Sequence, residues 1–127
     1  MRNGAVAGPT ITRRGADAMI EQQAVAIAEA YLEEILLQPV VPPAGAPVPT
    51  GRASFDDVDE YNGLLDVGAC DQFGNPISNL SSYTVSVAVA QSGALTGVPA
   101  SAARRIDVTV SHPSGATVTL SGYRANF

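Results

Sequence analysis

The sequence predicts an α+β domain in which a long N-terminal helix packs against a C-terminal antiparallel sheet of three to four strands. Two patterns predict this fold. Residues 13–38 repeat apolar side chains every three or four positions, which is the period of one helix face. Residues 81–127 instead alternate apolar and polar side chains, which is typical of half-buried strands. Both apolar faces are buried if the helix lies across the sheet, which gives a two-layer domain.

The predicted helix over 13–38 has one apolar stripe, made of Ile20, Ala24, Ile27, Ala28, Tyr31 and Ile35. Arg13 and Arg14 lie near its start, where the helix dipole disfavours cations, so we expect the helix to continue upstream of them. Its length of roughly 40 Å exceeds what the sheet needs for packing. The N-terminal half is therefore expected to project beyond the sheet and to contact neighbouring helices. The residues expected to be more exposed than Ile35 are Met19, Ile20, Ala24 and Ile27.

The segments between these patterns are predicted to be irregular. Residues 1–12 are expected to form a flexible leader before a single domain over 13–127. Pro39 ends the helix, and residues 39–50 hold five prolines, which indicates an extended spacer or a polyproline ligand. The loop region is expected to continue to residue 80, with short strands around Leu64–Val67.

Three strands are predicted in the last third of the chain, over Tyr83–Ala90, Arg105–Ser111 and Ala116–Ser121. The sequence between the last two, residues 112–115, reads His-Pro-Ser-Gly and is typical of a tight hairpin turn. The apolar side chains expected to face the helix are Val85, Val87, Ile106, Val108, Val118 and Leu120.

The composition argues against several classes of function. The net charge is −5 and all seven basic residues are arginine, which disfavours a general nucleic-acid binder. A single cysteine excludes an internal disulfide and a cysteine-based zinc site. That residue, Cys70, and the only histidine, His112, lie in different loop contexts, without a family signature for a nucleophile and its base. We therefore expect no catalytic residue, cofactor or metal site, and a reduced thiol without a role.

An acidic cluster follows the proline-rich segment and comprises Asp56, Asp57, Asp59 and Glu60. Carboxylates at this density can bind Ca²⁺, but their spacing lacks the alternating Asp pattern and the following Glu of an EF-hand. A solvated acidic loop is the favoured interpretation. Arg104 and Arg105 could bind an anion, but we expect them to be strand-edge charges that discourage pairing between sheets.

Three parts of the chain together resemble type IV pilins, and in particular the PilV-like minor pilins and those of the mannose-sensitive haemagglutinin (MSHA) pilus. These parts are the helix Gln23–Ile35, the acidic loop Phe55–Leu64, and the strands Arg105–Val110 and Leu120–Arg124. The resemblance covers residues 13–127. Pilins begin with a cleaved leader and an apolar anchoring helix, so we expect this sequence to lack that N-terminal membrane segment. Many pilins also have a C-terminal disulfide, which one cysteine cannot form.

The resemblance implies a structural minor subunit of a type IV pilus that contributes to fibre assembly or adhesion and is not an enzyme. Its partners would be other pilin subunits and, through the missing helix, the inner membrane of a Gram-negative bacterium, before the subunit enters the extracellular fibre. Two alternatives are a type II secretion pseudopilin, which shares the architecture, and a small periplasmic binding module or enzyme. A pocket with convergent polar groups would favour the binding module or enzyme, and a projecting helix would favour a pilin.

The resemblance also suggests how neighbouring subunits meet. Residues 51–71 have six carboxylates against Arg52, whereas residues 72–127 have three arginines against Asp107. Opposite net charges on two regions suit head-to-tail contact in a helical assembly. We expect the aspartates of the acidic loop to face the arginine-bearing surface of an adjacent subunit, with a purely solvated loop as the equal alternative. The candidate interface residues are Met19, Ile20, Ala24, Ile27, Asp56, Asp57, Asp59, Arg104 and Arg105.

Overall fold

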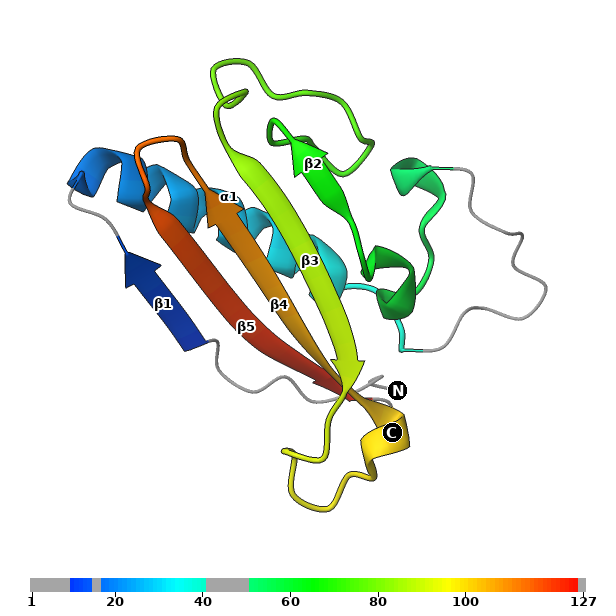
Figure 1. Cartoon of the computed structure of the whole chain (residues 1–127). Helices are drawn as coiled ribbons and strands as arrows, with labels where there is room; N and C mark the ends of the chain where they lie inside the picture. The colour runs from blue at the N-terminus through cyan, green and yellow to red at the C-terminus, as the bar shows by residue number, and fades with distance from the viewer. Residues whose placement is uncertain (1–9, 15–16, 41–50, 126–127) are drawn as a thin grey trace.

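The computed structural model describes residues 10–14, 17–40 and 51–125, which form one helix on one five-stranded sheet (Figure 1). The main elements are β1 (Thr10–Arg14), α1 (Ala18–Leu36), β2 (Leu65–Val67), β3 (Thr84–Gln91), β4 (Ala103–Ser111) and β5 (Thr117–Ala125). Short 3₁₀ turns are η1 (Arg52–Ser54), η2 (Val58–Tyr61) and η3 (Ala100–Ala102). The predicted α+β class and all three strands predicted in the last third of the chain are confirmed.

The sheet has the order β1-β5-β4-β3-β2, and every neighbouring pair is antiparallel. β4 lies at its centre, where Val108 is paired with Val87 on β3 and with Leu120 on β5. The predicted hairpin joins β4 to β5, with Gly115 donating its amide to the carbonyl of His112 at 2.9 Å. Gly115 has φ +96°, a left-handed conformation that glycine adopts without strain.

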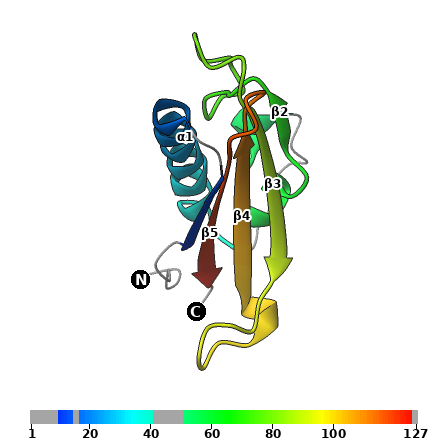
Figure 2. The ribbon, with the colours of Figure 1, turned by 60° about the vertical axis from the view of Figure 1, so that its left-hand side comes forward.

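The core lies between α1 and one face of the sheet (Figure 2). All six strand residues predicted to face the helix are buried in it, together with Tyr31 and Ile35 of α1. The opposite face of the central strands carries small polar side chains such as Thr109 and Thr119, whose hydroxyls are 3.1 Å apart. This division into one apolar and one polar face is what the two-residue alternation predicts.

The helix begins later than predicted, because Thr10–Arg14 forms a strand instead of a leader followed by helix. Asp17 caps α1: its carboxylate accepts the amides of Met19 at 3.0 Å and Ile20 at 3.1 Å. These bonds satisfy donors that a helix start leaves unpaired, so no continuation upstream is needed. Strand β1 takes the open edge of β5, which adds a fifth strand to the three or four predicted. Residues 1–9 of the predicted leader lie outside the described residues.

The predicted projection of the helix is wrong for Ala24 and Ile27, whereas Met19 and Ile20 are more exposed than Ile35, as predicted. Ala24 and Ile27 are 0% and 6% exposed, buried by the chain's own sheet, whereas Met19 is 77% exposed and Ile20 is half-buried. The reason is geometric: a helix of 19 residues is about 28 Å long. A strand of 9 residues spans about 30 Å. The helix and the strands therefore match in length, and α1 is buried against the sheet from Ala24 to Ile35.

A glycine in β5 sets how closely the helix approaches the sheet. A Cβ at Gly122 would lie 3.1 Å from Cδ2 of the buried Leu32 on α1. Gly122→Val is therefore expected to lower the free energy of unfolding by about 1–3 kcal/mol through overpacking. Urea denaturation measures this loss, and Gly93→Val is the matched control, because a Cβ there meets nothing within 4 Å. Equal stability of the two variants would contradict the close approach.

Candidate interaction surface

The acidic segment before β2 is organised by a reciprocal helix cap. Asp57 accepts the amide of Glu60 at 3.1 Å, and Glu60 accepts the amide of Asp57 at 3.3 Å. Burial, together with the charges of Glu60 and Asp59, raises the pKa of Asp57. The spacing of Asp57 and Glu60 is that of a capping box, a signal present in the sequence that predicts this turn. Asp57 is thus a buried cap and not part of a solvated loop.

The same segment is the candidate cation site of the sequence analysis. Carboxylate oxygens of Asp56, Asp57 and Glu60 lie within 4.8 Å of one another. Two of the three carboxylates already accept amides of the turn, and Oδ1 of Asp56 is buried without a hydrogen-bond partner. The capping role accounts for why these residues are gathered here, so the geometry does not by itself indicate a bound metal.

Two of the candidate interface residues meet each other within the chain. Nε of Arg104 lies 2.7 Å from one oxygen of Asp59, and Nη2 lies 3.2 Å from the other. Nη1 of Arg104 donates to the carbonyls of Ser101 and Ala103, both at 3.1 Å. The expected strand-edge role is therefore wrong, because β4 is a central strand and Arg104 is buried at its start. Its guanidinium ties the acidic segment to the sheet.

Of the two remaining arginines of the expected positive surface, one is buried and one is exposed. Arg124 is buried, and its Nε donates to the carbonyl of Gln38, just beyond the end of α1, at 3.0 Å. Arg105 is exposed and forms a 3.0 Å ion pair with Asp107 on the same strand. Of these three arginines, Arg105 alone is displayed to solvent. The described residues therefore do not form a broad basic face opposite the acidic segment.

A buried ionic network, which the sequence analysis did not predict, joins the segment 51–67 to α1. Arg52 contacts Glu34 through Nη2 and Asp66 through Nη1, both at 2.7 Å. The guanidinium carbon also lies 4.4 Å from the ring centroid of Tyr31. The available signal was the single arginine among the carboxylates of residues 51–71, which marks it as a partner for several of them.

Two tyrosine hydroxyls complete this network. Tyr31 donates to Asp66 at 2.6 Å and accepts the amide of Cys70 at 2.7 Å. Tyr61 donates to Glu34 at 2.8 Å. Burial and the hydrogen bond to Asp66 raise the pKa of Tyr31 to about 12, and burial with the bond to Glu34 raises the pKa of Tyr61. The polar groups of the network thus bond to one another, and three of them, Tyr31, Glu34 and Arg52, also line a groove beside α1.

These phenols predict a loss of stability in alkali. Because the folded pKa of Tyr31 is about 12 against an ordinary value of 10.0, the unfolded chain releases the proton first as pH rises. The stabilising contribution is complete below pH 10 and is lost as pH rises towards 12. Ultraviolet absorbance of tyrosinate should therefore rise together with unfolding measured by circular dichroism. If all tyrosines lost their protons while the chain stayed folded, the hydrogen bonds of Tyr31 and Tyr61 in this network would be contradicted.

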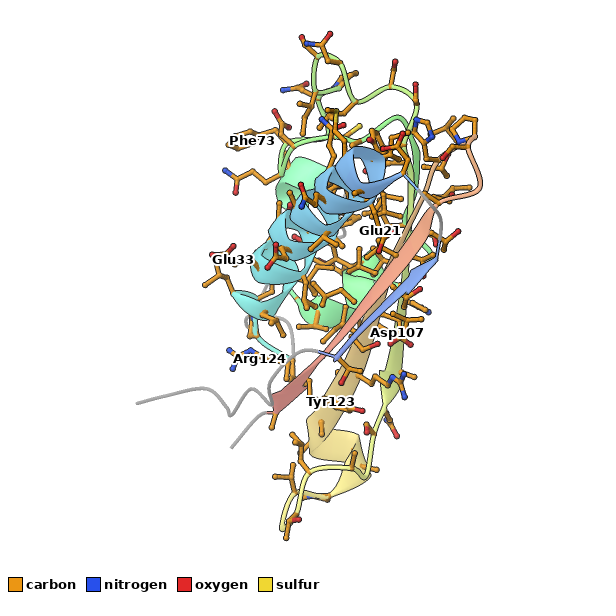
Figure 3. All side chains as sticks on the ribbon, turned by 90° about the vertical axis from the view of Figure 1, so that its left-hand side faces the viewer. Glu21, Glu33, Phe73, Asp107, Tyr123 and Arg124 are labelled. Atoms are coloured by element: carbon orange, nitrogen blue, oxygen red, sulfur yellow. The ribbon has the colours of Figure 1, made fainter. Side chains whose placement is uncertain are left out.

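An apolar groove lies between the outer face of α1 and the loop that follows β2. Its volume is about 650 Å³. The α1 side is lined by Gln23, Ala26, Ile27, Ala30, Tyr31, Glu33, Glu34 and Leu37, and the opposite side by Arg52, Cys70, Asp71, Gln72, Phe73, Ile77 and Leu80. Phe73 and Glu33 lie on the same flank of the molecule, on the side of α1 away from the sheet (Figure 3).

The predicted interface residues on α1 mostly lie outside this groove. Ile27 is part of its lining, whereas Met19, Ile20 and Ala24 are not. Cys70 lies at the groove as a free, half-buried thiol, and burial raises its pKa. A thiol with a raised pKa is a poor nucleophile at neutral pH. The absence of a catalytic role for Cys70 stays a prediction.

No family model, curated protein or solved structure matches the chain. Among the described residues, no helix has both the length and the apolar character needed to cross a membrane. The function is therefore argued from the residues and the geometry of the chain itself.

Proposed function

We propose that the chain is a structural minor subunit of a type IV pilus of the MSHA kind, which contributes to fibre assembly or adhesion and catalyses no reaction. One observation supports this most: the parts that carry the pilin resemblance pack against one another. Glu34, at the end of the helix segment, accepts from Tyr61 of the acidic segment at 2.8 Å. Asp59 of that segment pairs with Arg104, which directly precedes the first of the two resembling strands.

The proposal includes the partners and location that the resemblance implies. The subunit contacts other pilins in a fibre, is held at the inner membrane of a Gram-negative cell by a segment outside these residues, and then leaves with the fibre. Interfaces would use side chains that the fold leaves exposed, such as Met19 on α1 and Arg105 on β4. The domain buries Ala24, Ile27 and Arg104, so these three side chains support such a surface without contacting a neighbouring subunit.

A pseudopilin shares this architecture and is the alternative within the same class. A small binding module is the alternative from another class. The apolar groove beside α1 favours it, and so does the burial of Ala24 and Ile27, which were expected to project. A pilus subunit differs from both alternatives in where the protein is found. A pilus subunit leaves the cell surface with the fibres, whereas a pseudopilin or a binding module stays with the cell.

The test is to tag the protein at its own locus and shear the surface fibres from the cells. We expect the tagged chain in the sheared fibre fraction, together with a loss of surface fibres when the gene is deleted. Recovery only in the periplasmic fraction, with normal fibres after deletion, would contradict the proposal and favour the binding module. Loss of protein secretion with normal fibres would favour the pseudopilin.

A further inference from the structure

The groove beside α1 has the dimensions of a binding site for a helix. Its α1 lining extends from Gln23 to Leu37, which corresponds to about 21 Å along the helix axis. Ala26 and Ala30 lie one turn apart on this side, so the floor is low along its middle. Leu37 and Phe73 stand at the rim and are 80% and 61% exposed. An occupant of the groove would cover these two exposed apolar side chains.

The described lining of the groove carries a net negative charge, and Oδ1 of Asp71 already accepts the amides of Phe73 and Asn75. Glu33 is exposed on the α1 rim, and Asp71 lies on the loop rim. Arg52 is the one basic residue in the described lining, and its side chain is 5% exposed because Glu34 and Asp66 bind it. Carboxylates beside an apolar floor favour an occupant that is both apolar and cationic.

The backbone of the groove favours a helix over an extended peptide. One wall is α1, whose peptide groups are bonded within the helix. In the loop wall, Ile77 donates its amide to Ala69 at 3.0 Å, and Gly74 donates to Asp71 at 2.9 Å. Neither wall therefore offers the ladder of free groups that an added strand requires. A helix satisfies its own peptide groups and needs only an apolar stripe and a matching charge.

We propose that this groove binds an amphipathic α-helix of a partner protein that carries lysine or arginine beside its apolar stripe. The apolar side chains of that helix pack on Ala26, Ala30 and Phe73, and its cations lie beside Glu33 and Asp71. A helix of about 14 residues matches the length of the groove. The inference does not depend on the proposed pilus function, because the binding is a property of the isolated chain.

The test uses two labelled 14-residue peptides: an amphipathic leucine–lysine helix and its leucine–glutamate counterpart. Fluorescence anisotropy with the whole chain should show binding of the lysine peptide and none of the glutamate peptide. Phe73→Ser should weaken binding about tenfold, because the bound helix would cover this exposed aromatic side chain. Leu65→Ser is the matched control, because both side chains are 61% exposed and Leu65 lies outside the groove.

A second pair of variants tests the charge. Glu33→Lys should weaken binding of the lysine peptide, whereas Glu29→Lys should leave it unchanged, since both residues are exposed on α1 and only Glu33 lines the groove. Circular dichroism confirms that each variant is folded. Equal losses from the groove and control variants would overturn the proposal, because non-specific attraction to the net charge of −5 would then suffice. Equal binding of the two peptides would overturn the cationic requirement.

A second copy of the chain is the competing occupant, and sedimentation of the chain without peptide tests it. We expect the parent chain to sediment as a monomer, since the acidic groove repels another acidic copy. A dimer that Phe73→Ser dissociates and Leu65→Ser preserves would overturn the proposal, because the groove would then be a self-association surface.

Discussion

Arg52→Met is expected to lower the free energy of unfolding by about 3–5 kcal/mol, because it leaves two carboxylates without their shared cation. Arg52 bridges Glu34 on α1 and Asp66 on β2, with both contacts at 2.7 Å. The side chains of Glu34 and Asp66 are 12% and 15% exposed, so water compensates little of the lost attraction. The ring of Tyr31 also loses the cation that lies over it.

The measurement is urea denaturation at neutral pH, with Arg105→Met as the matched control. Arg105 also pairs with an aspartate, but that pair lies on the exposed surface of β4, and its loss should leave stability unchanged. Combining Arg52→Met with Glu34→Gln and Asp66→Asn removes the two carboxylate charges and should restore part of the stability. A full loss that persists in this triple variant would show that packing of the arginine stem, and not its charge, stabilises the segment.

The sequence predicted the parts of the fold that depend on a repeating pattern. Alternation identified β3, β4 and β5 because buried and less buried side chains alternate over 84–87, 106–111 and 117–120, with the buried ones in the core. The helix stripe likewise identified the residues of α1 that reach the core. In each case the local period and the tertiary environment specify the same face, so a single sequence suffices.

The errors have a common physical cause, which is dependence on a distant partner. β1 is five residues long and forms because β5 offers an open edge more than a hundred residues later in the chain. The apolar period of residues 13–38 places Arg13 and Arg14 in a helix, and this greater helix length is what predicts a projecting N-terminal half. Arg104 follows the same principle: its partner Asp59 lies 45 residues earlier, and no local pattern predicts the pairing.

The candidate site was predicted less well than the fold. The sequence marked the acidic segment as a surface, whereas Asp57 and Asp59 are used to build and attach the turn η2. The groove was not predicted at all, because its two walls come from α1 and from a loop without periodicity. Exposed Phe73 and Ile77 within that loop are the feature that a sequence could have offered, as apolar side chains in an otherwise polar loop.

Val108→Asp is expected to unfold most of the population at neutral pH. Val108 is fully buried at the centre of the sheet, between Val87 and Leu120. An ionised carboxylate there has no partner among the apolar residues around it, which costs more than about 4 kcal/mol. That loss is comparable with the whole stability of a small domain, which is about 5–15 kcal/mol. Loss of the cooperative thermal transition measures the effect.

The pH dependence of this variant separates charge from shape. Burial raises the folded pKa of the new carboxyl above its unfolded value of about 3.9, so the folded state holds the proton more tightly. The variant is then least destabilised below that unfolded value and loses stability as pH rises, by about 1.4 kcal/mol per unit. Val108→Thr keeps the shape without a charge, so it should cost about 1–3 kcal/mol with no such dependence.

Val67→Asp is the matched control for position, since Val67 is 82% exposed on the edge strand β2. The same chemical change there leaves the carboxylate in water, so the thermal transition should stay where it is in the parent chain. Two outcomes would contradict the buried central position of Val108: equal melting temperatures for the two aspartate variants, or a Val108→Asp variant whose stability does not change with pH. Either would mean that β4 does not lie beneath α1, and the register Val87–Val108–Leu120 would have to be abandoned.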